Sequence, residues 1–188
     1  MYELSSLDIS TITEKEFIAM YRQCSKSRKL RINRLKRDLD RKLSAAAGML
    51  ARNAISKKCG IPPEDIAFRR DKNGKPYAEN LDIHFSLSHS GTLAVCAISD
   101  KPIGVDVEKI RTVNYRVASR CFTPREQYYI FSDKRKVQSR FFEIWTKKEA
   151  YIKRHGMKLS DFPSFDVMDD NSVTLVQSKK YYIAIAES

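Results

Sequence analysis

The chain has 188 residues, of which 42% are hydrophobic and 31% are charged, and its formal net charge at pH 7 is +12. This apolar content is enough for a core in one compact unit or in two small subdomains, and it excludes a disordered chain. The positive charge favours anionic substrates or partners, because a basic surface attracts them over long range.

No run approaches the ~20 consecutive apolar residues of a membrane-spanning helix, and the first residues lack the basic and apolar regions of a secretory signal. We therefore expect a soluble, cytoplasmic protein that binds no membrane. The cysteines show no paired C-x-x-C spacing of the kind that holds zinc. We expect reduced, mostly buried thiols at Cys24, Cys59, Cys96 and Cys121.

The amino-terminal part predicts a short strand near residues 2–9, a helix from Glu14 to Gln23, and then one long basic helix that ends near Gly60-Ile-Pro-Pro63. Residues 26–42 contain nine lysines and arginines. A solvated cationic helix and a nucleic-acid-binding surface would both show this charge pattern. One face of the helix is apolar, with helical spacing at Ile32, Leu35, Leu39, Leu43, Leu50 and Ala54.

The middle of the chain predicts a strand near residues 66–69, a turn at 71–76, and strands at 82–88, 92–99 and 103–108. Strict alternation in the second of these strands places Phe85, Leu87 and His89 on one face. The pattern alone therefore favours a packed core histidine, whereas Ser88 is a polar residue of the opposite face.

Residues 103–108 alternate between apolar residues and carboxylates, which is typical of a half-buried strand. Asp106 and Glu108 then point to the same face with their α-carbons roughly 6.5–7 Å apart. Two such carboxylates can converge on one magnesium ion, because this metal prefers hard oxygen ligands. A solvated strand face would show the same alternation.

The carboxyl-terminal part predicts helices near residues 115–121, 124–132 and 138–154, and strands near 165–168, 172–177 and 181–186. In the last helix, Glu149 and Lys153 are neighbours at i and i+4, a spacing also typical of an ordinary surface ion pair. Lys148 lies near the middle of the apolar arc, where an ammonium group needs an anionic partner.

Four segments together resemble the phosphopantetheinyl transferases of the surfactin-synthetase-activating type. They follow one another in the order found in that family: Gly74-Lys-Pro76, Phe85-Ser-Leu-Ser-His-Ser90, Gly104-Val-Asp-Val-Glu108, and Trp145-Thr-Lys-Lys-Glu-Ala-Tyr-Ile-Lys153. The resemblance covers residues 74 to about 159.

This resemblance implies an α+β fold of two similar halves with pseudo-twofold symmetry, each half a small antiparallel sheet packed on a long helix. Residues 1–100 would carry the coenzyme A phosphate and adenine contacts, and residues 101–188 the metal and catalytic carboxylates. The halves would form one compact unit with the active site between them, and we expect a monomer.

The implied reaction is transfer of the phosphopantetheine arm of coenzyme A to a serine of an acidic acyl or peptidyl carrier protein, from fatty-acid, polyketide or nonribosomal-peptide synthesis. Mg²⁺, with Mn²⁺ as the alternative, would be held by Asp106, Glu108 and Glu149. Glu149 would be the general base, and Lys153 would orient the phosphates. Coenzyme A would contact Arg28, Arg31, Arg41, Lys75, Pro76, Ser88, His89, Lys148 and Lys153.

Three alternatives stay open. A metal-dependent nuclease would also use strand carboxylates, a lysine and a basic surface. A basic nucleic-acid-binding module would explain the charge and leave the carboxylates without a role. A noncatalytic member of the family is the third, although every metal and base position matches the pattern. We favour the transferase, and we expect no nucleic-acid partner.

Overall fold

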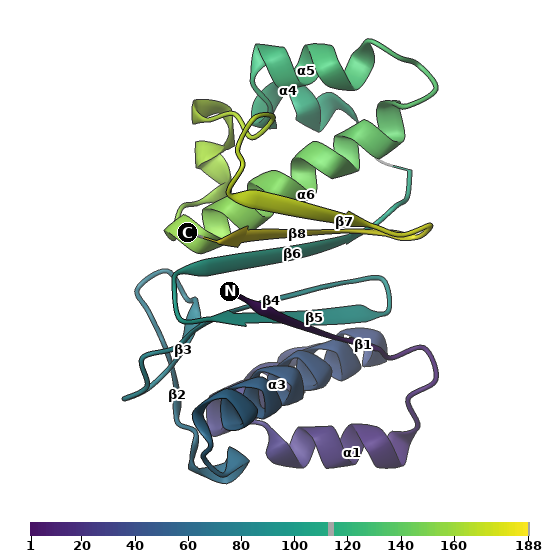
Figure 1. The fold of residues 1–188 in the computed structure, drawn as a ribbon. Coiled ribbons are helices and arrows are strands. Elements are labelled where there is room, and N and C mark those ends of the chain that lie inside the picture. Colours follow the sequence, from purple (N-terminus) through teal and green to yellow (C-terminus); the bar gives the residue numbers. More distant parts are fainter. Residues whose placement is uncertain (113–114, 188) are drawn as a thin grey trace. The chain divides into compact units, whose positions relative to one another are not determined.

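The computed structural model describes residues 1–112 and 115–187, and the chain divides into two compact units, Met1–Pro102 and Ile103–Ser188. Each unit contains one three-stranded antiparallel sheet and one long helix lying against it (Figure 1). The expected α+β class is confirmed, with small antiparallel sheets packed on helices. The pseudo-twofold relation between the halves stays a prediction.

In the amino-terminal unit, β5 (Leu93–Ser99) is the central strand and pairs with β1 (Glu3–Asp8) and β4 (His84–Ser90). The long helix α3 (Asp38–Cys59) packs on this sheet and also contacts α1 (Glu14–Gln23). Because α3 is covered on more than one side, its run of small residues 44–48 is buried throughout. The remaining elements are α2 (Lys26–Arg34), the 3₁₀ turn η1 (Pro63–Asp65), and the hairpin of β2 (Phe68–Arg70) with β3 (Pro76–Ala78).

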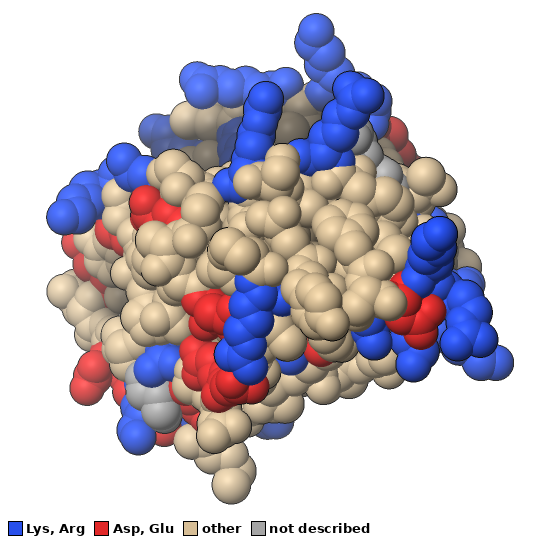
Figure 2. All heavy atoms as spheres, turned by 90° about the horizontal axis from the view of Figure 1, so that it is seen from above, with Lys and Arg blue, Asp and Glu red and all other residues tan. Residues whose placement is uncertain are grey.

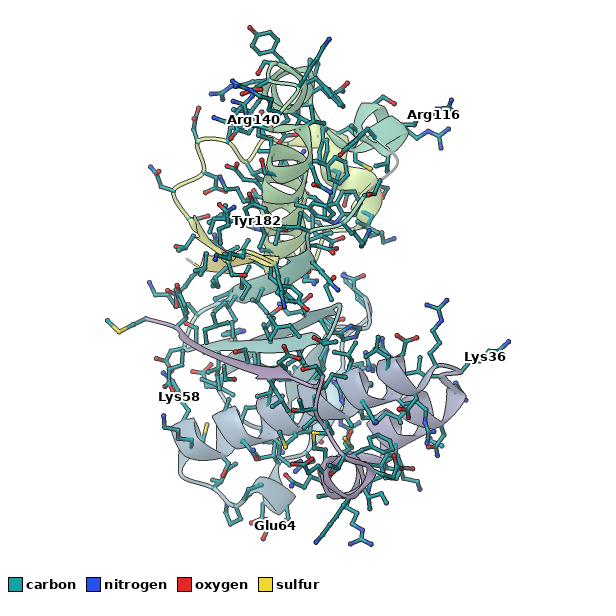
Figure 3. The ribbon with its side chains drawn as sticks, turned by 90° about the vertical axis from the view of Figure 1, so that its right-hand side faces the viewer. Lys36, Lys58, Glu64, Arg116, Arg140 and Tyr182 are labelled. Carbon is teal, nitrogen blue, oxygen red and sulfur yellow. The ribbon has the colours of Figure 1, made fainter. Side chains whose placement is uncertain are left out.

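The single long basic helix predicted from the sequence is wrong, because the segment forms two helices. Leu35 and Arg37 have extended backbones, with ψ of 132° and 134°, so the helix stops after Arg34 and starts again at Asp38. Because of this break, the apolar residues before and after it no longer follow one helical spacing, and Leu39 is 43% exposed. Lys36 projects outward from this break (Figure 3).

In the carboxyl-terminal unit, β8 (Tyr181–Glu187) is the central strand between β6 (Ile103–Lys109) and β7 (Val173–Gln177). The long helix α6 (Val137–His155) packs on this sheet and also contacts α5 (Pro124–Phe131). Shorter pieces complete the unit: the 3₁₀ turn η2 (Tyr115–Val117), α4 (Ala118–Cys121) and the 3₁₀ helix η3 (Leu159–Ser164).

The strand predicted near residues 165–168 is wrong. This segment is irregular and follows η3. Its apolar side chains serve helix packing, since the Phe165 ring stacks on Tyr151 of α6 with centroids 4.5 Å apart and Val167 is buried. The alternating apolar residues of this segment therefore belong to a packed loop and not to a strand.

A glycine brings β6 and α6 close together. A Cβ atom at Gly104 would lie 2.0 Å from the carbonyl oxygen of Ala150 and 2.6 Å from the amide nitrogen of Arg154. Only a residue without a side chain permits this backbone approach. Because residues of one parity share a strand face, the face that carries Gly104 toward α6 also carries Asp106 and Glu108.

The surface reflects the composition. In the face shown in Figure 2, Lys and Arg side chains project around the edge of a largely uncharged centre, and the acidic side chains form smaller groups. Within residues 1–112 and 115–187, no helix is long and apolar enough to cross a membrane. Cys24 and Cys96 are buried free thiols, whereas Cys59 is exposed.

Candidate active site

The carboxyl-terminal unit joins two of the predicted site residues in an ion pair. Lys153 Nζ on α6 lies 2.6 Å from Asp106 Oδ1 on β6. Asp106 is only 4% exposed, while the side chain of Lys153 is 29% exposed. These side chains meet between two elements whose backbones approach closely at Gly104.

Glu149 belongs to the same cluster. Burial, together with the charges of Asp106 and Glu108, raises the pKa of the Glu149 carboxyl to about 7, against the lowering effect of Lys153. The three predicted carboxylates and the lysine therefore lie within electrostatic reach of one another. A carboxyl group with a pKa near neutrality is suited to accept a proton at physiological pH.

The three carboxylates do not form a finished metal centre. Among the residues that the structure describes, no group of three or more His, Cys, Asp or Glu side chains is arranged to hold a metal ion. Glu108 instead lies 3.6 Å from Arg111 Nη2 in an ion pair. The metal assignment of Asp106, Glu108 and Glu149 therefore stays a prediction.

A pocket of about 350 Å³ opens beside Glu108. Its walls include the Arg111 guanidinium and the rings of Phe142 and Trp145, and Arg111 also lies over the Phe142 ring at 5.7 Å. Sequence analysis missed Arg111. Its spacing of three residues from Glu108 was the available signal, although β6 ends between them and no regular pattern connects the two residues.

Lys148 has its partners elsewhere in the same unit, and its contact with coenzyme A stays a prediction. Its side chain is fully buried, with Nζ 2.7 Å from Glu126 Oε2 and hydrogen bonds to the carbonyl oxygens of Phe162 and Phe165. Burial lowers the pKa of the Lys148 ammonium, and Glu126 opposes that effect. The expected anionic partner of Lys148 is therefore a side chain of the same unit.

In the amino-terminal unit, the structure places Arg28 and Pro76 in the wall of one small pocket. Burial lowers the pKa of the Arg28 guanidinium to about 10, and the neighbouring charges of Arg31 and Arg70 add to this effect. Arg41 lies elsewhere, over the Phe17 ring at 5.3 Å, and does not line this pocket. Of the predicted arginines, Arg28 therefore lines this pocket and Arg41 does not.

Lys75 and Pro76 lie at the end of the tight turn between β2 and β3. The Asp71 carboxylate accepts hydrogen bonds from the backbone amides of Asn73 and Lys75, at 2.8 and 2.9 Å. Gly74 has φ of +84°, a backbone angle that favours glycine. The turn predicted from the sequence is present, and it fixes Pro76 as the first residue of β3.

Ser88 and His89 lie near the end of β4. Ser88 is buried, whereas His89 is exposed and pairs with Ala94 close to the turn between β4 and β5. The alternation pattern suggested a core histidine, and that interpretation is wrong, because the strand reaches the edge of the core at this point. An exposed imidazole is accessible to a ligand.

Two family models match the chain. The model of the 4'-phosphopantetheinyl transferase superfamily matches residues 102–186, and the model of the amino-terminal part of 4'-phosphopantetheinyl transferase matches residues 11–101. The boundary between the two matches falls beside the boundary of the two structural units.

Curated bacterial relatives carry the same description. The 4'-phosphopantetheinyl transferase gsp of Aneurinibacillus migulanus is 37% identical over 74% of this chain and 60% of its own length. A 4'-phosphopantetheinyl transferase of Bacillus subtilis is 40% identical over 68% of this chain and 59% of its own length. The Bacillus subtilis protein Sfp is 34% identical, with shares of 74% and 61%. The matches thus span about 60% of each of these relatives, and the chain belongs to the 4'-phosphopantetheinyl transferase superfamily.

Proposed function

We propose that the chain transfers the phosphopantetheine arm of coenzyme A to a serine hydroxyl of an acyl or peptidyl carrier protein. The observation that carries this proposal is the Glu149 carboxyl, whose pKa lies near 7 beside the Asp106–Lys153 ion pair. A base poised near neutrality next to a lysine is the chemistry that phosphoryl-type transfer to a hydroxyl requires. Family membership supplies the substrate class.

In the proposed reaction, Glu149 accepts the proton of the carrier serine. The serine oxygen forms a bond to the phosphorus that bears the pantetheine arm, and the bond from that phosphorus to the bridging pyrophosphate oxygen breaks. Adenosine 3',5'-bisphosphate leaves with the bonding electron pair. Lys153 orients the phosphate oxygens, and its ammonium pairs with the Asp106 carboxylate.

The chemistry of these three carboxylates suits a divalent cation. Asp106 and Glu108 raise the pKa of Glu149, so these three groups disfavour one another's charge, and a hard cation would relieve that repulsion. We propose Mg²⁺, with Mn²⁺ as the alternative, held by Asp106, Glu108 and Glu149. When bound, the ion would supply neutralisation of the pyrophosphate charge.

The amino-terminal unit would bind coenzyme A through residues of α2, of the turn between β2 and β3, and of the end of β4. Arg28 and Pro76 line one pocket, and Arg31 lies within electrostatic reach of Arg28. The proposed contacts are Arg28, Arg31, Lys75, Pro76, Ser88 and His89. The net charge of +12 would attract coenzyme A and an acidic carrier protein. These substrates make the cytoplasm the proposed location, and we propose a monomer.

The test is the mass of a purified apo carrier protein after incubation with the chain, coenzyme A and Mg²⁺. We expect the carrier to gain one phosphopantetheine group, and we expect the gain to stop when the metal is chelated. A parallel incubation with single- and double-stranded DNA covers the nuclease alternative. DNA cleavage without carrier modification, for carriers of all three biosynthetic classes, would reject the transferase.

A further inference from the structure

The amino-terminal unit has another pocket, of about 620 Å³, that contains none of the residues proposed to contact coenzyme A. Its volume lies within the roughly 300–1,000 Å³ of typical small-molecule sites. Figure 3 shows Glu64, one of its residues, projecting from η1. The end of α1, the helix α3 and the turn η1 form its walls through Arg22, Gln23, Cys24, Arg52, Pro63 and Glu64.

Arg52 is a buried cation without a counter-charge. The residue is only 7% exposed, and no carboxylate among residues 1–112 and 115–187 forms an ion pair with it. Lys148, the other buried cation of these residues, has the Glu126 carboxylate at 2.7 Å. Burial lowers the pKa of the Arg52 guanidinium. A buried cation of this kind is costly, and an anionic ligand would reduce that cost.

One of the three guanidinium nitrogens of Arg52 carries all of its hydrogen bonds to the described residues. Nη1 donates to the carbonyl oxygens of Pro63 and Ile66. The Phe68 ring lies 5.0 Å from the guanidinium carbon and covers one face of the group. Nε and Nη2 are not among the fully enclosed, unsatisfied atoms of the described part of the chain. These two donors are therefore accessible from the pocket that Arg52 lines.

The remaining donors and charges indicate the kind of ligand. The Nε and Nη2 edge of a guanidinium presents two parallel N–H groups, which match the two oxygens of a carboxylate. Arg22 and Gln23 are exposed pocket residues and add a second cation and an amide. Glu64 is also exposed in the pocket, and its negative charge repels a dianion more strongly than a monoanion. The pocket therefore favours a ligand with a single carboxylate.

We propose that this pocket binds a small monocarboxylate through the Nε and Nη2 donors of Arg52. Arg22 adds long-range attraction for the ligand, and Glu64 selects against dianions such as phosphate. The site does not depend on the proposed transfer reaction, so it is tested in the absence of coenzyme A and of any carrier protein.

The test is a titration of the isotope-labelled chain with sodium propionate, followed by nuclear magnetic resonance. The backbone amide signals of Gln23 and Glu64 report binding at this pocket. Inorganic phosphate, at a pH where it is a dianion, is the comparison ligand. We expect saturable shifts with propionate in the millimolar range, and about threefold weaker binding of phosphate at the same amides.

Three variants locate the binding. Arg52→Lys keeps the charge but lacks the paired donors, and we expect it to weaken propionate binding about tenfold. Glu64→Gln should strengthen binding about two- to threefold, because a repelling charge is removed. Asp65→Asn is the matched control: Asp65 is exposed in the same turn, does not line the pocket, and should have no effect. If thermal unfolding shows that Arg52→Lys is not folded, the comparison of the two η1 variants decides.

Several outcomes would overturn the proposal. Propionate shifts that do not saturate, or that leave the amides of Gln23 and Glu64 unchanged, mean that the pocket binds no carboxylate. Phosphate that binds there more tightly than propionate contradicts the preference for a monoanion. Folded Arg52→Lys protein with wild-type affinity excludes the paired donors. Equal effects of Glu64→Gln and Asp65→Asn indicate only a general charge effect.

Discussion

Two lysines of α6, five positions apart, form ion pairs of different character. Lys148 and Glu126 are both fully buried, and Lys148 also lies over the Phe165 ring at 4.6 Å. Lys153 and Asp106 form an equally short pair, but the Lys153 side chain is 29% exposed. The first pair is closed on all sides by its own unit, whereas the Lys153 side chain of the second is partly open to solvent.

The buried pair also organises the chain around it. Glu126 Oε2 accepts the amide of Thr123 at 2.9 Å and so completes the capping box of α5, while Oε1 accepts the amide of Val167 at 3.1 Å. One carboxylate therefore joins α5, α6 and the segment after η3. A lysine within a family motif can therefore serve the fold, and its burial distinguishes it from a lysine that is open to solvent.

The largest effect is expected at the open cluster. Glu149→Gln should lower the turnover number about 10²- to 10⁴-fold, because the variant lacks the proposed base. Coenzyme A affinity and the free energy of unfolding should change little. Steady-state kinetics with an apo carrier and calorimetric titration with coenzyme A measure these quantities. A variant that loses nucleotide binding but keeps its turnover would make Glu149 a binding residue only.

The next effect tests the closed pair. Glu126→Gln should lower the free energy of unfolding by roughly 3–5 kcal/mol, because Lys148 would remain buried without its counter-charge. The double variant Glu126→Gln, Lys148→Met should recover part of that loss, since no unpaired cation is left. Urea unfolding of the three proteins gives the values. A single variant within about 1 kcal/mol of wild type would show that the pair contributes little to the fold.

A smaller effect is expected where β6 meets α6. Gly104→Ala places a methyl group against the backbone of Ala150, and such overpacking costs about 1–3 kcal/mol. Because the same approach aligns Asp106 with Lys153, transfer should fall as well. Thermal unfolding and kinetics of the variant are the readouts. Wild-type activity in a destabilised Gly104→Ala protein would separate the packing from the alignment of the site.

The smallest effect is expected at a third ion pair of α6. Lys147 Nζ lies 3.2 Å from Glu143 Oε1 at i, i+4, with both side chains partly exposed. Lys147→Gln should change the free energy of unfolding by only about 0.3–0.5 kcal/mol. Urea unfolding measures it, and a loss as large as that of Glu126→Gln would break the proposed link between burial and stabilisation.

Sequence patterns were sufficient for the elements that carry the site. Alternation in β6 and the i, i+4 spacing in α6 predicted which side chains share a face of each element, because both features depend on local geometry. The meeting of the two elements was expected from the family resemblance. The sequence also predicted that Lys148 needs an anion. It could not identify Glu126, since that residue lies in another helix.

The features that were missed depend on tertiary structure. No glycine or proline marks the break between α2 and α3, which becomes visible only in the backbone angles of Leu35 and Arg37. Arg70 and Gly48 are distant in sequence, and their common pocket exists only after β2 and α3 have packed. The loop at residues 165–168 alternates like a strand at its start because Phe165 and Val167 both pack into the core of the carboxyl-terminal unit.

The most direct measurement is the intact mass of an apo carrier protein incubated with this chain, coenzyme A and Mg²⁺, beside the same incubation with Glu149→Gln. We expect the wild-type chain to add one phosphopantetheine group at the carrier serine, and the variant to do so about 10²- to 10⁴-fold more slowly. If the wild-type chain leaves fatty-acid, polyketide and nonribosomal-peptide carriers unmodified, the proposed transfer is wrong, and if the variant modifies them at the wild-type rate, Glu149 is not the base.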